Sequence, residues 1–579
     1  MSTSTNPNST DLPPNTTRHT LPPESELRLE VPFGITCTVT LRSGSADATT
    51  AASSSKTTPP ADNEIINGTA ELFGAELPPS RPLYFTGTKL AIFTWHGCTL
   101  DVTNEDQLDI LYVSEETDCN VAYVNTHAQL EVMRDESLGC LVGNPQQGGG
   151  GGNNSNNSNN NNNKEKIEGP RVLLAGPPDC GKSSLAKILT AYAVKLGRTP
   201  LLVDLDASQN MLSVPGTLAA CPMGAEGVRA EGFGTCSVMN GGNVGGGANG
   251  NASNAAVMTP LVLWYGSMDL TAHPDLYKAQ LHKLGTAVEG RLANDVDARA
   301  SGIIVNTSGL IEDVGYSYIL EAIQAFKINV VLVLGHDRLY SMLGTHFKKQ
   351  AKEEEERKKK MEEEAPQTTP QSSSSTLTPI PKLIKLPRSG GVVSRDAAFR
   401  RASRSQSIKR YFYGDILPPK SPDATNANAT ASSSISPTTA ATSPLQYQFT
   451  PNLIETPIHS LHLHKLTSLS LTASLLPVSS KQSTDPIQIT TLPSSEITSK
   501  FQHSVWAVCH PSAVEKFERA DAASNGGGKK ARELFLAGVA GFVVVEKVDA
   551  EREMVSLLSP CGGSLPSGHM LVGDVAWME

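Results

Sequence analysis

A glycine-rich octapeptide near the end of the chain's first third has the residues to bind phosphate. Residues 176–183 read GPPDCGKS, which fits the pattern GxxxxGK[ST]. In this pattern the glycines let backbone N–H groups close around phosphate oxygens, and the helix that follows adds positive charge at its start. Lys182 is expected to contact the β- and γ-phosphates, and Ser183 is expected to hold Mg²⁺. The octapeptide therefore predicts binding of a nucleoside triphosphate.

Two further groups of charged side chains have residue types that suit the same chemistry. Residues 203–209 read VDLDASQ, in which Asp204 and Asp206 alternate with apolar neighbours. Both carboxylates should project from one face near the end of a strand, where open α/β sheets bind ligands. A basic stretch, residues 385–410, carries eight Lys or Arg residues and a single acid, Asp396. It is expected either to bind phosphates, ATP or an RNA backbone, or to be a solvent-exposed helix without a ligand.

The phosphate-binding loop requires a strand before it and a helix after it. Arg171–Ala175 has the length and apolar character of a buried strand, and apolar residues recur on one helical face from Ser183 to Leu196. The same patterns predict strands at Leu201–Leu205, Gly302–Asn306 and Val330–Leu334, and a helix at Tyr316–Phe326. Strands alternating with helices predict an α/β P-loop NTPase domain with a mostly parallel sheet. The alternative to nucleotide binding by residues 176–183 is that they form only a glycine-rich helix start that binds no ligand.

Low-complexity stretches divide the chain into three folded regions. Short alternating apolar runs predict a β-sandwich before the loop and a small β-rich domain near the C-terminus. Tracts rich in Ser, Thr, Asn, Gly and Pro bury too little apolar surface to offset the entropy of ordering, so we expect disorder there. The predicted order is a disordered tail (1–22), an N-terminal β domain (23–143, insertion 43–62), a Gly/Asn linker (144–166), a P-loop domain (167–415, insertions 224–254 and 348–378), a Ser/Thr/Pro linker (416–450) and a C-terminal β-rich domain (451–579).

Composition excludes several classes of protein. The 579 residues carry a formal net charge of −10, so no global positive field attracts nucleic acid or a membrane surface. Nine cysteines occur without a CxxC pair and without an apolar N-terminal leader, which indicates a reducing, intracellular compartment. No apolar run reaches the length that crosses a bilayer. We therefore expect a soluble protein of the nucleus or cytoplasm.

The motifs occur together and in the same order in one known family. Matching stretches are ELRLEV at residue 26, GTAELFGAEL at 68, KLAIFTWHGC at 89, the phosphate-binding loop, VDLDASQ, SVPGT at 213, LIKLPRSGGVV at 383, IKRYFYG at 408 and VAGFVVVEKVD at 539. The chain resembles the P-loop subunit of the pre-mRNA cleavage and polyadenylation factor, within the eukaryotic polynucleotide 5′-hydroxyl-kinase family. The family does not require the insertions, which explain the chain's length and suggest a fungal or otherwise divergent member.

The resemblance implies which residues bind ATP and Mg²⁺. In the family a glutamate and a lysine of the N-terminal domain clamp the nucleotide, and they match Glu26 and Lys89. Contacts between ATP and the loop are implied at Asp179, Cys180, Gly181, Lys182, Ser183 and Ser184. Ser183 and Asp206 match the residues that hold Mg²⁺.

The resemblance also implies catalytic roles, which apply only if the protein is an active kinase. Lys182 would act on phosphate, and Asp206 matches the general base, with Gln209 following in the same motif. Arg404 and Lys409 fall where we expect the two lid arginines of active kinases over the transferring phosphate. A lysine at the second position replaces a bidentate guanidinium by a point charge.

One departure from the family pattern bears on activity. Active members carry a tryptophan directly after the NTxG segment, where it stacks on the acceptor RNA. Here Asn306–Gly309 is followed by Leu310, which cannot supply a stacking interaction worth about 1–3 kcal/mol per base. Two hypotheses follow: an ATP-bound scaffold required for endonucleolytic cleavage in mRNA 3′-end formation, or an RNA 5′-hydroxyl kinase. Leu310 favours the scaffold.

The family resemblance implies partners and a location as well. The expected partner is the large scaffold subunit of the cleavage factor, which also binds the tail of RNA polymerase II. Other cleavage and polyadenylation subunits are expected in the same complex, with pre-mRNA contacted indirectly. The implied location is the nucleus, and no membrane contact is expected.

Overall fold

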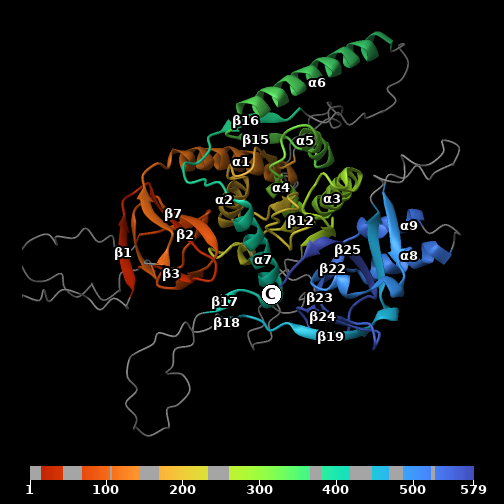
Figure 1. Ribbon diagram of the computed structural model, residues 1–579. Helices are drawn as coiled ribbons and strands as arrows, with labels where there is room; N and C mark the ends of the chain where they lie inside the picture. Colours follow the sequence, from red (N-terminus) through yellow and green to blue (C-terminus); the bar gives the residue numbers. More distant parts are fainter. Residues whose placement is uncertain are drawn as a thin grey trace, which may run out of the picture.

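Three domains, each built on β-sheet, meet around helix α7 (Ala397–Tyr413), which lies near the middle of the molecule (Figure 1). The computed structural model describes residues 15–42, 68–104, 107–142, 168–232, 260–364, 380–417, 446–467, 487–522 and 528–578. Within these ranges, no helix combines the length and the apolar character needed to cross a membrane.

The central domain is built on a seven-stranded sheet. Its strands are β10 Arg171–Ala175, β11 Leu201–Asp204, β12 Thr217–Pro222, β13 Leu261–Trp264, β14 Ile303–Asn306, β15 Val330–Leu334 and β16 Lys382–Leu386. Strands β11-β14-β10-β15-β16 run parallel in that order, and β12 and β13 continue the sheet antiparallel beyond β11. Every residue of β10 and β15 is buried, as expected of strands covered on both faces. The predicted P-loop fold with a mostly parallel sheet is confirmed.

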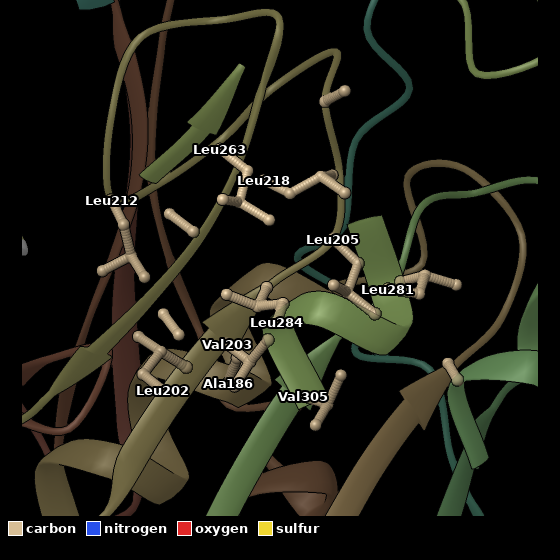
Figure 2. Close-up of a cluster of buried hydrophobic side chains, with 14 of the residues drawn as sticks. Ala186, Leu202, Val203, Leu205, Leu212, Leu218, Leu263, Leu281, Leu284 and Val305 are labelled. Carbon is tan, nitrogen blue, oxygen red and sulfur yellow. The ribbon is translucent and has the colours of Figure 1, made fainter. Parts of the chain in front are cut away.

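The described part of the central domain also contains α-helices. They are α1 Asp118–Val142, α2 Lys182–Lys195, α3 Pro274–Asn294, α4 Val296–Ser301, α5 Val314–Ala325, α6 Asp337–Glu364 and α7 Ala397–Tyr413. Figure 2 shows part of the core, in which Val203 of β11 and Val305 of β14 gather with Leu281 and Leu284 of α3. The core thus fixes the ends of β11 and β14, which carry the residues of the site.

Helix α1 was not predicted, and it moves a domain boundary. The N-terminal β domain was expected to extend to residue 143, but α1 packs against α2 and α4, and its Tyr123 and Leu130 belong to the central core. Arg134 is also buried in this interface, where Nε donates to the Ser301 carbonyl oxygen at 2.9 Å. By its packing, α1 belongs to the central domain.

The N-terminal domain is the predicted β-sandwich. Its strands are β1 Thr16–Leu21, β2 Ser25–Val31, β3 Cys37–Leu41, β4 Glu71–Leu72, β5 Ala75–Glu76, β6 Pro82–Phe85, β7 Thr88–Thr94, β8 Cys98–Thr103 and β9 Ile110–Ser114. Two antiparallel sheets, β1-β8-β3-β6 and β5-β4-β7-β2-β9, enclose an apolar core. Strand β2 therefore holds Glu26 beside β7, which carries Lys89.

The prediction of a disordered tail through residue 22 is wrong for β1. This strand pairs with β8 along its whole length, from Thr16 opposite Thr103 to Leu21 opposite Cys98. Its side chains are mostly polar, so no alternation of apolar residues predicts a strand there. The strand is held instead by its ladder, by buried Leu21 and by an ion pair between Arg18 and Asp101 at 2.9 Å.

Other predicted insertions and linkers lie largely outside the described residues. This applies to residues 1–14 of the tail, to the insertion at 43–62, to the linker at 144–166, and to 233–254, 365–378 and 418–445. Within the predicted insertions, residues 348–364 continue α6 as a helix, and Ala230 is buried in the core of the N-terminal sandwich. The second linker begins and ends in a two-stranded sheet, β17 Ile416–Leu417 with β18 Gln446–Tyr447.

The C-terminal domain is β-rich, as predicted, but its described residues also include the α-helices α8 and α9. Its elements are β19 Asn452–Pro457, β20 His462–Thr467, β21 Gln488–Leu492, β22 Ser504–Cys509, α8 Pro511–Ala522, α9 Gly528–Phe535, β23 Val539–Asp549, β24 Met554–Ser559 and β25 His569–Ala576. The strands form one sheet in the order β19-β24-β23-β22-β25-β20-β21. The end of this domain packs against α7, which places it in contact with the helix that borders the site.

Candidate nucleotide-binding site

The phosphate-binding loop connects β10 to α2, as its sequence predicts. Gly181 adopts a left-handed φ of +92°, and Asp179 adopts φ of +51°, which aspartate tolerates better than most residues. The ammonium of Lys182 donates to the carbonyl oxygens of Gly176 at 2.9 Å and Pro177 at 2.7 Å. Burial lowers the pKa of Lys182 below its ordinary value. A buried ammonium beside the backbone of a glycine-containing loop is suited to bind a polyphosphate.

Two carboxylates lie at the end of β11, but only one reaches the cavity beside the loop. Asp206 lines this cavity, and its Oδ1 accepts hydrogen bonds from the N–H and hydroxyl of Ser208 at 3.0 and 2.8 Å. Asp204 is fully buried behind it, and burial together with the charge of Asp206 raises its pKa to about 7. The predicted alternation therefore gives one half-buried carboxylate at the cavity and one fully buried carboxylate behind it.

The N-terminal sandwich supplies the opposite wall. Glu26 of β2 is only 5% exposed, and its carboxylate pairs with the guanidinium of Arg28. Burial raises the pKa of Glu26. Lys89 of β7 pairs with Glu30 at 2.7 Å, and its ammonium lies 5.2 Å from the centre of the Phe399 ring. Both residues predicted to clamp the nucleotide line the same cavity as the loop.

The segment from Val392 to Arg400, which includes the start of α7, lies over the phosphate-binding loop, and we call it the lid. Asp179 Oδ2 accepts from the N–H of Arg395 at 3.0 Å and from the guanidinium of Arg400 at 2.6 Å. Val392 lies 3.2 Å from the position that a Cβ on Gly181 would occupy, which leaves little room for a side chain there. The lid therefore rests directly on the loop.

These walls enclose one cavity of about 470 Å³, which is large enough for a nucleotide. Its lining includes every predicted binding residue: Glu26, Lys89, Asp179, Cys180, Gly181, Lys182, Ser183, Ser184 and Asp206. Gln209 and Leu310 also line it, and the side-chain nitrogen of Gln209 is buried without a hydrogen-bond partner among the described residues. An unpartnered amide at a cavity wall is suited to contact a ligand.

Two residues predicted for the lid lie elsewhere. Lys409 does not line the cavity; its ammonium lies 5.5 Å from the ring of Tyr413 and 5.0 Å from that of Tyr447. Arg404 is also absent from the lining; burial and the charges of Arg400 and Arg401 lower its pKa, and the charge of Asp206 acts in the opposite direction. Within the basic stretch at residues 385–410, the cations that do line the cavity are Arg395 and Arg400. Both pairs have the same five-residue spacing, so the sequence alone could not distinguish them.

The residues present fit ATP and Mg²⁺. The loop, Lys182, Arg395 and Arg400 would hold the phosphates, and Ser183 and Asp206 offer oxygen ligands to the cation. Across the described ranges, no group of three or more His, Cys, Asp or Glu side chains is placed to hold a metal ion.

Helix α7 connects this site to all three domains. At its start, the ring of Phe399 lies 5.3 Å from that of Phe33 in the N-terminal sandwich. Farther along, Trp577 of the C-terminal domain donates from Nε1 to Ser405 Oγ at 3.0 Å and stacks on Phe412 at 5.9 Å. The lid and the C-terminal domain are thus parts of one packed unit.

Comparisons with known proteins agree with this arrangement. The family profile described as the mRNA cleavage and polyadenylation factor CLP1 P-loop matches residues 176–378. The N-terminal beta-sandwich domain of polyadenylation factor matches 54–137, and pre-mRNA cleavage complex II protein Clp1 matches 449–579. The mRNA cleavage and polyadenylation factor clp1 of Aspergillus niger is 33% identical over 94% of this chain and 92% of its own. The CLP1 homolog of Dictyostelium discoideum is 29% identical over 89% and 85%.

Solved structures share the fold over almost the whole chain. A wild-type Clp1p–Pcf11p complex matches with a TM-score of 0.63 and 19% identity over 97% of this chain and 98% of the other. A second structure, which describes an extended Pcf11p–Clp1p interface and the basis of ATP loss in a glycine-to-arginine point mutant, matches with a TM-score of 0.64 and 20% identity over 97% and 99%. At these identities the likeness establishes the fold alone.

Proposed function

Because the chain belongs to the Clp1 family of mRNA cleavage and polyadenylation factors, we propose that it is an ATP-binding subunit of the nuclear pre-mRNA cleavage factor. In this role bound ATP·Mg²⁺ holds the N-terminal and central domains together. The observation that carries the proposal is the shared cavity: Glu26 and Lys89 from the sandwich and Lys182 from the loop line one space. A ligand that contacts both domains stabilises their docking by mass action.

The proposed partner is the large scaffold subunit of the cleavage factor. Two solved relatives with this fold are complexes of Clp1p with Pcf11p, and the corresponding subunit is the proposed partner here. In this complex the chain acts as a scaffold required for endonucleolytic cleavage of pre-mRNA, and its contact with RNA is indirect. The nucleus follows as its location because this processing takes place there.

A depletion and add-back assay tests this function. A nuclear extract depleted of its own Clp1-family subunit should lose pre-mRNA cleavage and regain it when the wild-type chain is added. Lys182→Ala should restore cleavage poorly, because the loop loses the cation that contacts phosphate. Failure of the wild-type chain to restore cleavage would contradict membership in the machinery. Equal restoration by Lys182→Ala would show that the scaffold needs no ATP.

RNA 5′-hydroxyl kinase activity is the second candidate function. It is favoured by Asp206, which is available as a general base, and by Arg395 and Arg400, two cations at the cavity that the sequence assignment missed. Against it stands Leu310, which lines the cavity and is 38% exposed at the position of the family's stacking tryptophan. Phosphoryl transfer depends on positioning both substrates, so loss of acceptor stacking removes transfer while ATP binding persists.

An assay with labelled ATP and a 5′-hydroxyl oligoribonucleotide separates the two functions. The wild-type chain should transfer little or no phosphate, and Leu310→Trp should raise transfer. Lys182→Ala in the same background serves as the control that removes any genuine signal. Strong wild-type transfer that Lys182→Ala abolishes would make the chain an active kinase and overturn the scaffold assignment.

A further inference from the structure

One buried amide links the metal-binding hydroxyl of the loop to a carboxylate two strands away. Strand β14 lies between β10 and β11, and its last residue, Asn306, pairs with Leu174 on one side and with Asp204 on the other. The end of β14 therefore fills the space between the phosphate-binding loop and Asp204. Asn306 and Asp204 are both fully buried.

The amide of Asn306 contacts both neighbours through a single nitrogen. Nδ2 lies 3.0 Å from Asp204 Oδ1 and 3.3 Å from Ser183 Oγ, so its two hydrogens have one acceptor each. Asp204 is itself held in place, because its other oxygen accepts from the N–H of Met211 at 2.7 Å. Asp204 does not line the cavity, whereas Ser183 does. The three side chains thus run from the cavity wall into the core.

This chain of contacts restricts what the Ser183 hydroxyl can do. A hydroxyl oxygen has two lone pairs. The Asn306 amide uses one of them, which leaves the second to coordinate a cation, and it keeps the side chain in one rotamer. The Asp204 carboxylate orients the amide from behind. Residues that orient a metal ligand in this way typically change metal affinity by about 10- to 100-fold when they are lost.

We propose that Asn306 is a positioning residue for Mg²⁺, which sets the orientation of the Ser183 hydroxyl and is itself held by the buried carboxylate of Asp204. The ligand it serves is a divalent cation that arrives with the nucleoside triphosphate. This inference rests on the proposed function, because it assumes that the cavity binds ATP·Mg²⁺. It adds that Asp204 supports the metal site without touching the metal.

The alternative is that Asn306 only joins β11 to β14. A purely structural role predicts that Asn306→Ala lowers the melting temperature and leaves the effect of Mg²⁺ on ATP binding unchanged. A positioning role predicts a loss that appears only when Mg²⁺ is present. The two roles therefore differ in a quantity that does not depend on catalytic activity.

Calorimetric titration of the full chain with ATP, in Mg²⁺ and in EDTA, provides the test. The dissociation constant in EDTA divided by the dissociation constant in Mg²⁺ measures what Mg²⁺ contributes to ATP binding. In Asn306→Ala this ratio should shrink about tenfold or more, while the dissociation constant in EDTA changes by no more than about threefold. Asp204→Asn, which keeps the shape of the side chain, should reduce the ratio in the same direction. The double variant should add little to either change, because both residues act through Ser183.

Asn210→Ala is the matched control. Asn210 is also a buried amide, in the loop between β11 and β12, where Nδ2 donates to the Thr217 carbonyl oxygen at 3.0 Å and Oδ1 accepts from the N–H of Leu212 at 2.8 Å. It does not line the cavity. Its loss should lower the melting temperature without changing the Mg²⁺ ratio.

Each outcome decides between the hypotheses. An unchanged Mg²⁺ ratio in Asn306→Ala and Asp204→Asn overturns the positioning role and leaves the proposed function intact. A ratio that falls equally in Asn210→Ala also overturns it, because the effect is then general destabilisation. Absence of ATP binding by the wild-type chain in either buffer refutes the proposed function, and this inference with it.

Discussion

Replacing Trp577 by alanine should weaken ATP binding, although this residue does not line the cavity. Trp577 is 5% exposed, stacks on Phe412 of α7 and donates to Ser405 of the same helix. Truncating a buried tryptophan typically costs about 3–5 kcal/mol. If about a third of that loss, roughly 1.4 kcal/mol, falls on the docking of α7 and its lid, ATP affinity should drop about tenfold.

Two further substitutions, a milder change at the same position and a change at its exposed neighbour, serve as controls. Trp577→Phe keeps an aromatic ring but loses the N–H donor, which is worth about 1 kcal/mol, so it should weaken ATP binding only a few-fold. Met578 is 69% exposed, and Met578→Ala should change nothing measurable. Calorimetry gives the affinities, and backbone hydrogen exchange of α7 reports its docking. Faster exchange in α7 of Trp577→Ala together with unchanged ATP affinity would refute the coupling between this helix and the site.

Three other substitutions test separate contacts. Arg400→Ala removes the ion pair with Asp179 that holds the lid, so ATP should dissociate about tenfold faster in stopped-flow measurements; an unchanged rate would mean that the lid does not retain ATP. A Cβ at Gly309 would lie 2.8 Å from the backbone of Pro178, so Gly309→Ala should displace the loop and weaken ATP binding by about 1–3 kcal/mol, and unaltered affinity would argue against this contact. Burial lowers the pKa of His464 to about 4, so between about pH 6.5 and 4 the unfolded chain binds a proton that the folded ring does not, and stability should fall by up to about 3 kcal/mol as pH decreases. His464→Gln should make the melting temperature less dependent on pH across this range. A wild-type melting temperature that does not change with pH in this range would contradict the reasoning.

The sequence predicted best those strands whose residues are mostly apolar. Strands β10, β11, β14 and β15 are buried on both faces, so their composition alone identifies them. The loop was predictable because its glycines, lysine and serine must occur at fixed spacing. Glu26 and Lys89 came from the family resemblance, since nothing in their own surroundings marks them as neighbours of a loop more than 80 residues away.

The missed elements are held by polar or charged side chains. Helix α1 buries Arg134, which bonds to Glu131 and to the Ser301 carbonyl oxygen, and such burial breaks the apolar period that predicts a helix. Strand β1 pairs through its backbone and an ion pair, so its composition resembles a disordered tail.

The lid shows a different limit of sequence reasoning. Two pairs of cations in the basic stretch share one spacing, and only contact with Asp179 identifies Arg395 and Arg400 as the pair at the cavity. That contact joins residues more than 200 positions apart, which a single sequence does not reveal. Local patterns thus placed the phosphate-binding loop, while tertiary packing decided which cations face it.

Calorimetric titration of the full wild-type chain with ATP·Mg²⁺, beside Glu26→Ala and Lys182→Ala, tests the central claim most directly. Glu26 and Lys182 line one cavity from different domains. We predict that the wild-type chain binds one ATP and that both variants bind it substantially more weakly, with Glu26→Ala also loosening the N-terminal sandwich in hydrogen exchange. Wild-type affinity in Glu26→Ala, with binding lost only in Lys182→Ala, would contradict a nucleotide held between two domains.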